Sequence, residues 1–541
     1  MIKLARPLLL LFLFISSALA ARVERLIDKW RPEHYLVNIT LNDQLSELTS
    51  ASARINVLIL KPTSLIDLDF GDLTIDTVTL NSQPASFTHK DGKLLVTLPA
   101  PANPGTRFVV TVNYHGKPKD GLILSKDPDG KPSAVGDNWP DRVHHWIPVL
   151  DHPSAKATVT FNITAAAHEE VVANGRLDHV ETSADGQRTW TYSEGSPIPP
   201  YCMVIAVGQF ARVEAAQSSI TPLSYYVPQS ERELALKGFA PSNLSVEFFT
   251  KTFAPYPYEK LALIVGATRF GGMENSSAIV FTSNLLTRPG TAGLSKTFGI
   301  PASNVGLIAH EIAHQWFGDS VTESTWADLW LSEGFATYFG NVFVQRYEGE
   351  DVFQSYMRSA ATNIFAYDKK KLTPIFDRDT EDLFDLLNTI NYQKGSWVLH
   401  MLRSRLGDDV FFRGIRNYYE AHKNSTAGTE DLRAALEKSS GKNLRAFFTR
   451  WVYESGHPQY ELEWQWLGKK ALRLVLTQVQ PGNAFEDPVA LKITTATGSR
   501  EIVLKPSGKQ LIETIRLAEK PTRIEIDPQN VLLDEATVKG S

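Results

Sequence analysis

The chain has 541 residues, 43% of them hydrophobic and 21% charged, a composition typical of a soluble globular protein with room for about three domains. Its formal net charge is −5, its pI is about 6.3 and no basic stripe stands out, so the sequence argues against a nucleic-acid partner. Cys202 is the only cysteine, which excludes an intramolecular disulfide.

The first twenty residues have the pattern of a signal peptide. Lys3 and Arg6 give a positive start, residues 8–15 form a short apolar core, and residues 18–20 form a small-residue cleavage site. We therefore expect a mature chain that begins at Ala21 and is exported, either to a periplasm or out of the cell. An uncleaved membrane anchor is the alternative, but the apolar run is short for a bilayer. No later stretch could span one, so we expect no transmembrane segment in the mature chain.

Residues 21–220 are predicted to form an all-β N-terminal domain. Apolar and polar residues alternate in several segments, which is the pattern of half-buried strands. The clearest of these segments are residues 35–41, 55–60 and 108–114. Turn-forming Asp-Gly pairs at residues 91–92 and 129–130 separate such segments, so a saddle or sandwich is the expected arrangement.

The remaining sequence divides into two parts. Residues 221–457 begin with a short β portion and become mostly helical, and they contain the motifs described below. Residues 458–541 return to an alternating pattern, with a predicted hairpin that turns at Gly468 and Lys469, so a small C-terminal β-sandwich is expected. The predicted fold class is a multidomain α+β protein.

The most informative motif is His-Glu-Ile-Ala-His at residues 310–314. Residues four apart share one face of a helix, so His310 and His314 can bind one metal ion while Glu311 points beside it. Glu333 follows after eighteen residues and can supply a third ligand. Two histidines and one carboxylate leave a fourth position for water, which is the ligand set of a catalytic zinc ion. We therefore expect one Zn²⁺ per chain, with Glu311 as the general base.

The residues around this motif favour metal binding over a chance match. Asn304 is the predicted N-cap of the helix and Gly318 its predicted stop. The sequence between them is largely apolar, so the helix is expected to be buried. A buried helix rarely carries two histidines and a glutamate unless something binds them.

Glu333 lies in a second apolar stretch of helical pattern, residues 326–336. A bare carboxylate there would be costly, so a metal ligand is the favoured interpretation and a buried salt bridge is the alternative. Asp328 in the same stretch has two open interpretations: an acceptor for a ligand histidine, or a charge on the helix surface.

Further motifs accompany these two stretches. They are Gly271-Gly272-Met273-Glu274-Asn275, Tyr392-Gln393-Lys394-Gly395, and Trp451 with Gly456-His457-Pro458. Together with residues 309–318 and 326–336, these motifs resemble those of the aminopeptidase N family of gluzincin zinc metallopeptidases, both in their order and in their residues. The chain resembles a short, bacterial-type member of that family. The resemblance implies a thermolysin-like α+β catalytic domain and aminopeptidase activity on peptides with a free N-terminus. It also implies that Tyr392 donates a hydrogen bond to the oxyanion.

The segment at residues 271–275 is predicted to bind the substrate. Consecutive glycines, Gly271 and Gly272, let an extended peptide backbone approach closely. Glu274 can then bind the substrate's free α-ammonium group, which would confine cleavage to the first residue. Met273 is expected to line the pocket for the first side chain, and Asn275 is included as a substrate-binding residue of the same motif.

The sequence departs from the resembled family in three ways. The family usually has Ala where Gly272 stands, which is a small change. It usually has a Gln in the amine site, upstream of the position of Arg142; no Gln stands there, and Asn138 is the candidate to replace it. Larger family members continue into a further helical domain, for which this chain ends too soon, so we expect an open site that admits longer peptides.

Three other functions were weighed against an exported aminopeptidase. A thermolysin-like endopeptidase shares the zinc ligands, but the presence of Glu274 within the motif at residues 271–275 argues against an endopeptidase. An epoxide hydrolase of the leukotriene hydrolase branch would have a helical rather than a β C-terminal domain. A non-catalytic binding scaffold usually lacks a ligand or the base, whereas all of them are present in this sequence.

Overall fold

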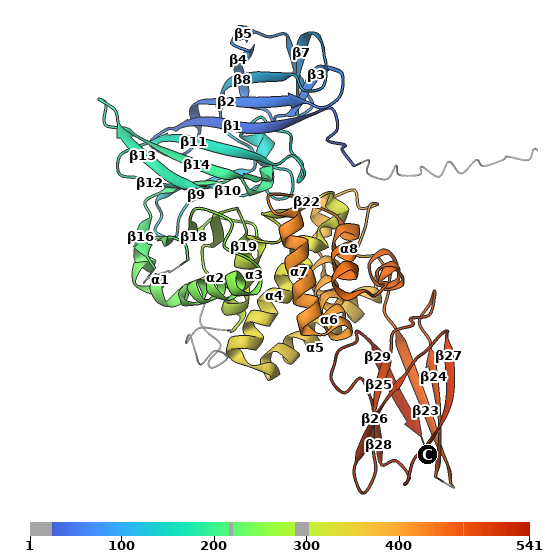
Figure 1. The fold of residues 1–541 in the computed structure, drawn as a ribbon. Coiled ribbons are helices and arrows are strands. Elements are labelled where there is room, and N and C mark those ends of the chain that lie inside the picture. Colours follow the sequence, from blue (N-terminus) through green and yellow to red (C-terminus); the bar gives the residue numbers. More distant parts are fainter. Residues whose placement is uncertain (1–23, 216–219, 287–301, 469, 541) are drawn as a thin grey trace, which may run out of the picture.

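The computed structural model describes residues 24–215, 220–286, 302–468 and 470–540. The predicted signal peptide, residues 1–20, lies outside the described residues. A β-rich N-terminal part, a largely helical central part and a C-terminal part made of β-sheets follow one another along the chain (Figure 1). None of the described helices is long and apolar enough to cross a lipid bilayer.

The N-terminal part is built on a long sheet with the strand order β13-β14-β11-β1-β2-β8-β4-β5, beside which lie the sheets β3-β7-β6 and β12-β15-β10-β9. The strands are β1 (Trp30–Leu41), β2 (Leu48–Ile59), β3 (Thr63–Asp69), β4 (Thr74–Leu80), β5 (Gln83–Pro84), β6 (Phe87–Lys90), β7 (Lys93–Ala102), β8 (Arg107–Gly116), β9 (Leu122–Lys126), β10 (Pro132–Gly136), β11 (Ala157–Ala165), β12 (Glu170–Ala173), β13 (Arg176–Thr182), β14 (Arg188–Ile198) and β15 (Ile205–Gly208). The alternation of buried and less buried residues predicted for β1 is confirmed, because Val37 and Ile39 are buried while Asn38 between them is only partly buried.

The central part combines a five-stranded sheet, of order β16-β17-β18-β20-β19, and a two-stranded sheet, β21-β22, with a group of packed helices. Its strands are β16 (Ala211–Glu214), β17 (Leu223–Val227), β18 (Leu261–Gly266), β19 (Gly272–Met273), β20 (Ala278–Thr282), β21 (Val321–Glu323) and β22 (Ser425–Ala427). Its helices are α1 (Arg232–Gly238), α2 (Ala240–Thr252), α3 (Ala302–His314), α4 (Trp330–Glu348), α5 (Glu350–Asp368), α6 (Gly395–Leu406), α7 (Asp408–His422), α8 (Thr429–Ser440) and α9 (Arg445–Phe448). A π-helical turn, η6 (Ile390–Lys394), runs directly into α6. Strand β16 precedes the predicted boundary at residue 220 yet pairs with β17.

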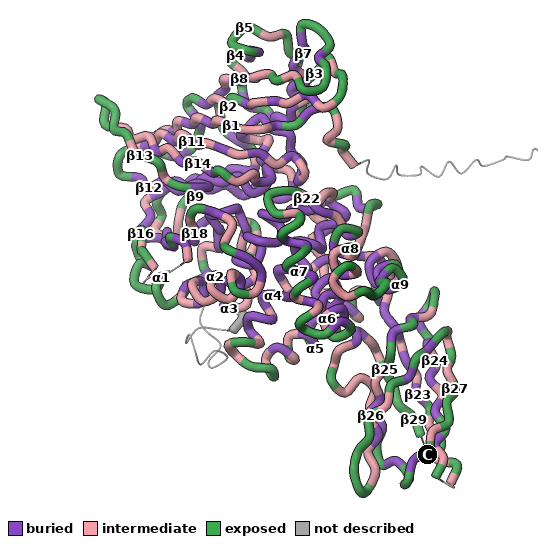
Figure 2. The backbone as a smooth tube through the Cα atoms, in the orientation of Figure 1, coloured by how far each residue is buried: buried purple, intermediate pink, exposed green. Residues whose placement is uncertain are grey.

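Helices α3 and α4 lie against each other at the centre of the largest hydrophobic core. Aromatic rings from neighbouring segments pack on α4: Phe317, just after α3, lies on Phe335 with ring centroids 4.7 Å apart, and Phe253, just after α2, lies on Phe339 at the same distance. Residues 311–336, from the end of α3 into α4, are all buried except Ser324 and Thr325 (Figure 2). The helices with the predicted metal ligands are therefore held by dense packing, which a precise catalytic site requires.

The N-terminal part is tied to the central part close to these helices. Half-buried Lys156 donates hydrogen bonds to the carbonyl oxygens of Asp319 and Ser320, both at 2.7 Å, in the loop that follows α3. Arg269, two residues before the double glycine, forms an ion pair with Asp120 of the N-terminal part at 2.9 Å. The N-terminal part thereby positions the approaches to β19.

The C-terminal part consists of the sheets β27-β24-β23-β29 and β26-β25-β28. Its strands are β23 (Gln459–Gly468), β24 (Ala471–Gln478), β25 (Val489–Thr494), β26 (Ser499–Leu504), β27 (Gln510–Arg516), β28 (Arg523–Ile526) and β29 (Glu535–Gly540). Strands β23 and β24 are antiparallel, which confirms the predicted hairpin. Asp487 links this part to the helices, because it accepts a hydrogen bond from Trp451 Nε1 at 2.8 Å and pairs with Arg405 at 3.0 Å.

Candidate active site

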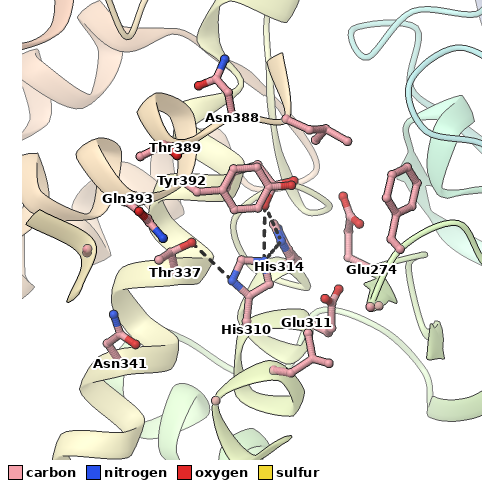
Figure 3. Close-up of a pocket in the computed structure, with 18 of the residues that line it drawn as sticks. Glu274, His310, Glu311, His314, Thr337, Asn341, Asn388, Thr389, Tyr392 and Gln393 are labelled. Carbon is pink, nitrogen blue, oxygen red and sulfur yellow. Dashed lines mark hydrogen bonds and ion pairs between the residues drawn. The ribbon is translucent and has the colours of Figure 1, made fainter. Parts of the chain in front are cut away.

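Helix α3 presents His310 and His314 on one face, as the motif predicts (Figure 3). The predicted helix limits were wrong. Asn304 lies inside α3, where its Nδ2 donates to the carbonyl oxygen of Leu285 at 3.1 Å, and it is not the N-cap. The helix ends at His314, and Gly318 with a φ of 124° belongs to the turn that follows.

Glu333, near the start of α4, faces the two histidines. Its Oε2 lies 3.3 Å from His310 Nε2 and 3.4 Å from His314 Nε2, and the two Nε2 atoms are 3.0 Å apart. Tetrahedral zinc with bonds of about 2.0–2.1 Å separates neighbouring ligand atoms by about 3.3 Å. The three atoms therefore form a triangle of the size that fits around one zinc ion.

The opposite ring nitrogens fix the orientation of the histidines. His314 Nδ1 lies 3.2 Å from the carbonyl oxygen of Phe317 and 3.0 Å from Ser332 Oγ. A carbonyl only accepts, so Nδ1 donates and Nε2 is left for a metal. His310 Nδ1 lies 3.5 Å from Thr337 Oγ1, on the next turn of α4 after Glu333.

Asp328 has neither of the two roles considered from the sequence. It is buried, and its Oδ1 accepts hydrogen bonds from the backbone nitrogen and the hydroxyl of Thr429, both at 2.8 Å. Its Oδ2 accepts from Thr325 Oγ1 at 2.9 Å. Asp328 thus satisfies the free N–H at the start of α8 and contacts no ligand histidine.

The substrate-binding segment predicted at residues 271–275 crosses in front of α3. Met273 in β19 pairs with Val280 of β20, which fixes the register of the segment. Gln315, the residue after His314, donates to the carbonyl oxygen of Glu274 at 2.9 Å and accepts from the backbone nitrogen of Ser277 at 2.8 Å. The side chain of one residue therefore clamps the Glu274 strand to the zinc helix.

A single cavity of about 700 Å³ gathers most of the predicted residues. Its lining includes Gly271, Gly272, Met273, Glu274, His310, Glu311, His314, Glu333 and Tyr392. In Figure 3, Glu274, Glu311 and Tyr392 surround His310 with their oxygen atoms directed into this space. Asn275 is not part of the lining; it is fully buried behind the strand, with its Nδ2 3.4 Å from the carbonyl oxygen of Met273.

Three buried carboxyl groups, those of Glu274, Glu311 and Glu333, face this cavity. Burial raises the pKa of Glu311 well above its usual range, and the neighbouring Glu274 adds to the shift. Burial raises the pKa of Glu274 as well. The pKa of His314 rises to about 10 although burial opposes this, because Glu274 and Glu333 favour its charged form. A site in which three carboxylates meet without a lysine or arginine in its described lining suits a bound cation.

Tyr392 lies in η6, with its ring parallel to that of His310 at a centroid distance of 6.1 Å. Burial raises the pKa of Tyr392 well above its usual range, and the Glu333 carboxylate adds to the shift. The phenol therefore keeps its proton at neutral pH and remains a hydrogen-bond donor.

Near Arg142, the residue that reaches the cavity is not the one predicted from the sequence. Asn138 points into the N-terminal core, where its Nδ2 donates to the carbonyl oxygen of Met203 and its Oδ1 accepts from Trp146 Nε1 at 2.8 Å. Its neighbour Trp139 lines the cavity instead and packs edge-on against Phe270, with centroids 6.3 Å apart. An aromatic side chain, and not the predicted polar one, therefore reaches the cavity at this place.

Two family profiles match the chain on either side of this site. Residues 31–202 match the Peptidase M1 N-terminal domain, and residues 242–451 match the Peptidase family M1 domain, which contains all three candidate zinc ligands. The chain belongs to the M1 peptidase family. Zinc dependence is general in this family, in agreement with the ligand triangle described above.

Proteins similar to the chain include several that are named aminopeptidases. The chain is 28% identical to "Tricorn protease-interacting factor F2" of Thermoplasma acidophilum, over 82% of this chain and 56% of the relative. It is 26% identical to "Puromycin-sensitive aminopeptidase" of Caenorhabditis elegans, over 90% and 53%, and 30% identical to "Aminopeptidase M1-A" of Oryza sativa, over 61% and 38%. The chain thus spans about half the length, or less, of these relatives.

Proposed function

We propose that the chain is an exported, zinc-dependent aminopeptidase that removes single residues from the N-terminus of peptides. The observation that carries this proposal is the meeting, in one cavity, of the triangle formed by His310, His314 and Glu333 with the buried carboxylate of Glu274. The relatives named aminopeptidases support the same activity. Export is supported by the N-terminal sequence pattern alone.

His310, His314 and Glu333 would hold the zinc ion in a thermolysin-like arrangement. When bound, zinc supplies a Lewis acid that polarises the scissile carbonyl and lowers the pKa of water to about 7. Glu311 lies beside the ligands without being one of them. A bound cation would oppose the rise in the pKa of Glu311 that burial causes, so that its carboxylate can accept the proton of the attacking water. The same carboxyl group then donates that proton to the leaving amine.

The other residues select and stabilise the substrate. The Glu274 carboxylate accepts a charge-assisted hydrogen bond from the substrate's α-ammonium group. Met273, with Trp139 and Phe270 nearby in the lining, provides an apolar wall for the first side chain. The protonated Tyr392 phenol donates a hydrogen bond to the oxyanion that develops on the scissile carbonyl. Cleavage is confined to the first peptide bond because binding of the α-ammonium group by Glu274 fixes which peptide bond reaches the metal ligands.

Amino-acid arylamides test this function. The enzyme should hydrolyse leucine arylamide and leave the N-acetylated compound intact, and a chelator should abolish turnover. Glu311→Gln should keep stoichiometric zinc and lose activity by several orders of magnitude, because only the proton acceptor is removed. Equal turnover of the free and the acetylated substrate would reject the role of Glu274 and point to an endopeptidase.

A further inference from the structure

Two residues of the sequence motifs have no part in the proposed reaction. Lys394 belongs to the Tyr-Gln-Lys-Gly motif and ends η6, the turn that carries Tyr392. His457 belongs to the Gly-His-Pro motif and stands just before β23, the first strand of the C-terminal part. Both are buried, and both relate to the same carboxylate, Asp368 at the end of α5.

His457 is held between two carboxylates. Its Nδ1 lies 2.6 Å from Asp368 Oδ2, and its Nε2 lies 3.2 Å from Glu535 Oε2, at the start of β29. A carboxylate offers only acceptors, so each ring nitrogen of His457 faces a hydrogen-bond acceptor. Phe365 of α5 covers the ring at a centroid distance of 4.4 Å. His457 therefore fastens the C-terminal sheet to the end of α5.

Lys394 lies within electrostatic reach of Asp368. Its Nζ is fully buried and has no hydrogen-bond partner among the described residues. The Oδ1 atom of Asp368 is also buried and also lacks a hydrogen-bond partner among these residues. Burial lowers the pKa of Lys394 to about 8, and the charge of Asp368 acts against that shift. The turn η6, which carries Lys394, packs on α5, which carries Asp368. Two side chains of opposite charge, each with an atom that lacks a hydrogen-bond partner, therefore lie in neighbouring elements.

A series of ionisable side chains thus leads from the C-terminal sheet to the turn of Tyr392. The order is Glu535, His457, Asp368 and Lys394, and Lys369 pairs with Glu535 at 3.0 Å beside it. Tyr392 and Lys394 share one π-helical turn, so a shift of Lys394 moves the phenol. A misplacement of about 1 Å in a catalytic group can cost roughly 100-fold in rate.

We propose that His457 and Asp368 are positioning residues through which the C-terminal part holds Tyr392 in place. The inference rests on the proposed peptidase function only for its activity readout. It assigns a role in catalysis to a domain that contributes no residue to the described lining of the cavity.

A double-mutant cycle tests the proposal. His457→Gln should lower kcat about 10-fold with KM unchanged within twofold in the natural chain, and change kcat less than twofold in a Tyr392→Phe background. Arg405→Gln is the matched control, because it breaks the contact with Asp487 at the same domain boundary without reaching Tyr392. It should leave kcat within twofold. Equal losses in both backgrounds, or no loss in either, would overturn the proposal.

Hydrogen–deuterium exchange of the full chain provides a readout that does not depend on activity. The backbone amides of residues 390–399 should exchange several-fold faster in His457→Gln and unchanged in Arg405→Gln. Unchanged exchange in His457→Gln would overturn the proposal. Faster exchange in a protein without aminopeptidase activity would reject the proposed function while supporting the coupling.

Discussion

Gly272 lies so close to Glu311 that a Cβ atom on Gly272 would stand 2.4 Å from the Glu311 carboxylate. Alanine, the residue usual in the family, is a small change in volume, but here it would displace the proposed general base. We expect Gly272→Ala to lower kcat roughly 10- to 100-fold with zinc content unchanged, since the clash is with the end of a flexible side chain. Steady-state kinetics with metal analysis checks this.

The control for this prediction is Gly306→Ala, on the same helix as Glu311. A Cβ there would meet Tyr356 and Val344 only at ordinary contact distances of 3.9 and 4.0 Å. Its kcat should stay within a few-fold of the natural chain. Wild-type kinetics in Gly272→Ala would mean that Glu311 works from another position.

Tyr392→Phe removes the hydroxyl and keeps the ring that stacks on His310. Loss of one oxyanion donor should lower kcat about 100- to 1,000-fold, with KM changed only a few-fold, because the bond forms only in the transition state. Tyr356→Phe, at another hydroxyl of the cavity lining, should have little effect. Similar losses in the two variants would remove the special role of Tyr392.

Zinc affinity should depend on Glu333 and, less strongly, on the hydrogen bond between Ser332 Oγ and His314 Nδ1. We expect Glu333→Gln to purify with little zinc, and Ser332→Ala to bind it about 10-fold more weakly. Competition with a chromogenic chelator measures both. Unaltered affinity in Glu333→Gln would exclude this carboxylate as a ligand.

Acid should destabilise the protein through His400. This side chain is buried, its Nε2 donates to the carbonyl oxygen of Asn530 at 3.2 Å, and burial lowers its pKa to about 4. Below pH 6.5 the unfolded chain binds a proton that the folded chain does not, so the free energy of unfolding falls with pH. The loss attributable to His400 should reach about 2 kcal/mol between pH 6.5 and 5.

Urea unfolding of the natural chain and of His400→Gln across this range measures that effect. The variant should be less stable at pH 7.5, and the difference between the two proteins should shrink as the pH falls. A difference that stays constant with pH would show that His400 does not titrate with a lowered pKa.

The sequence predicted the features that depend on residues close together in the chain. The period of two in β1 and the spacing of four in α3 determine which side chains share a face, so strands and paired histidines could be predicted from the sequence alone. The hairpin of β23 and β24 followed for the same reason.

Contacts between distant segments could not be predicted in this way. Asp328 satisfies the start of α8, which lies about a hundred residues later in the chain, and no local pattern indicates that partner. Trp139 reaches the cavity because the N-terminal part docks beside β19, whereas Asn138 next to it turns into its own core. Helix limits also depended on tertiary contacts, as the bond from Asn304 to Leu285 illustrates.

The most direct test of the central claim is the mass spectrum of a ten-residue peptide digested by the purified protein. The meeting of the His310, His314 and Glu333 triangle with Glu274 predicts a ladder that shortens one residue at a time from the N-terminus. The same peptide with an acetylated N-terminus should remain whole. Internal fragments, or cleavage of the acetylated peptide at a similar rate, would contradict the account.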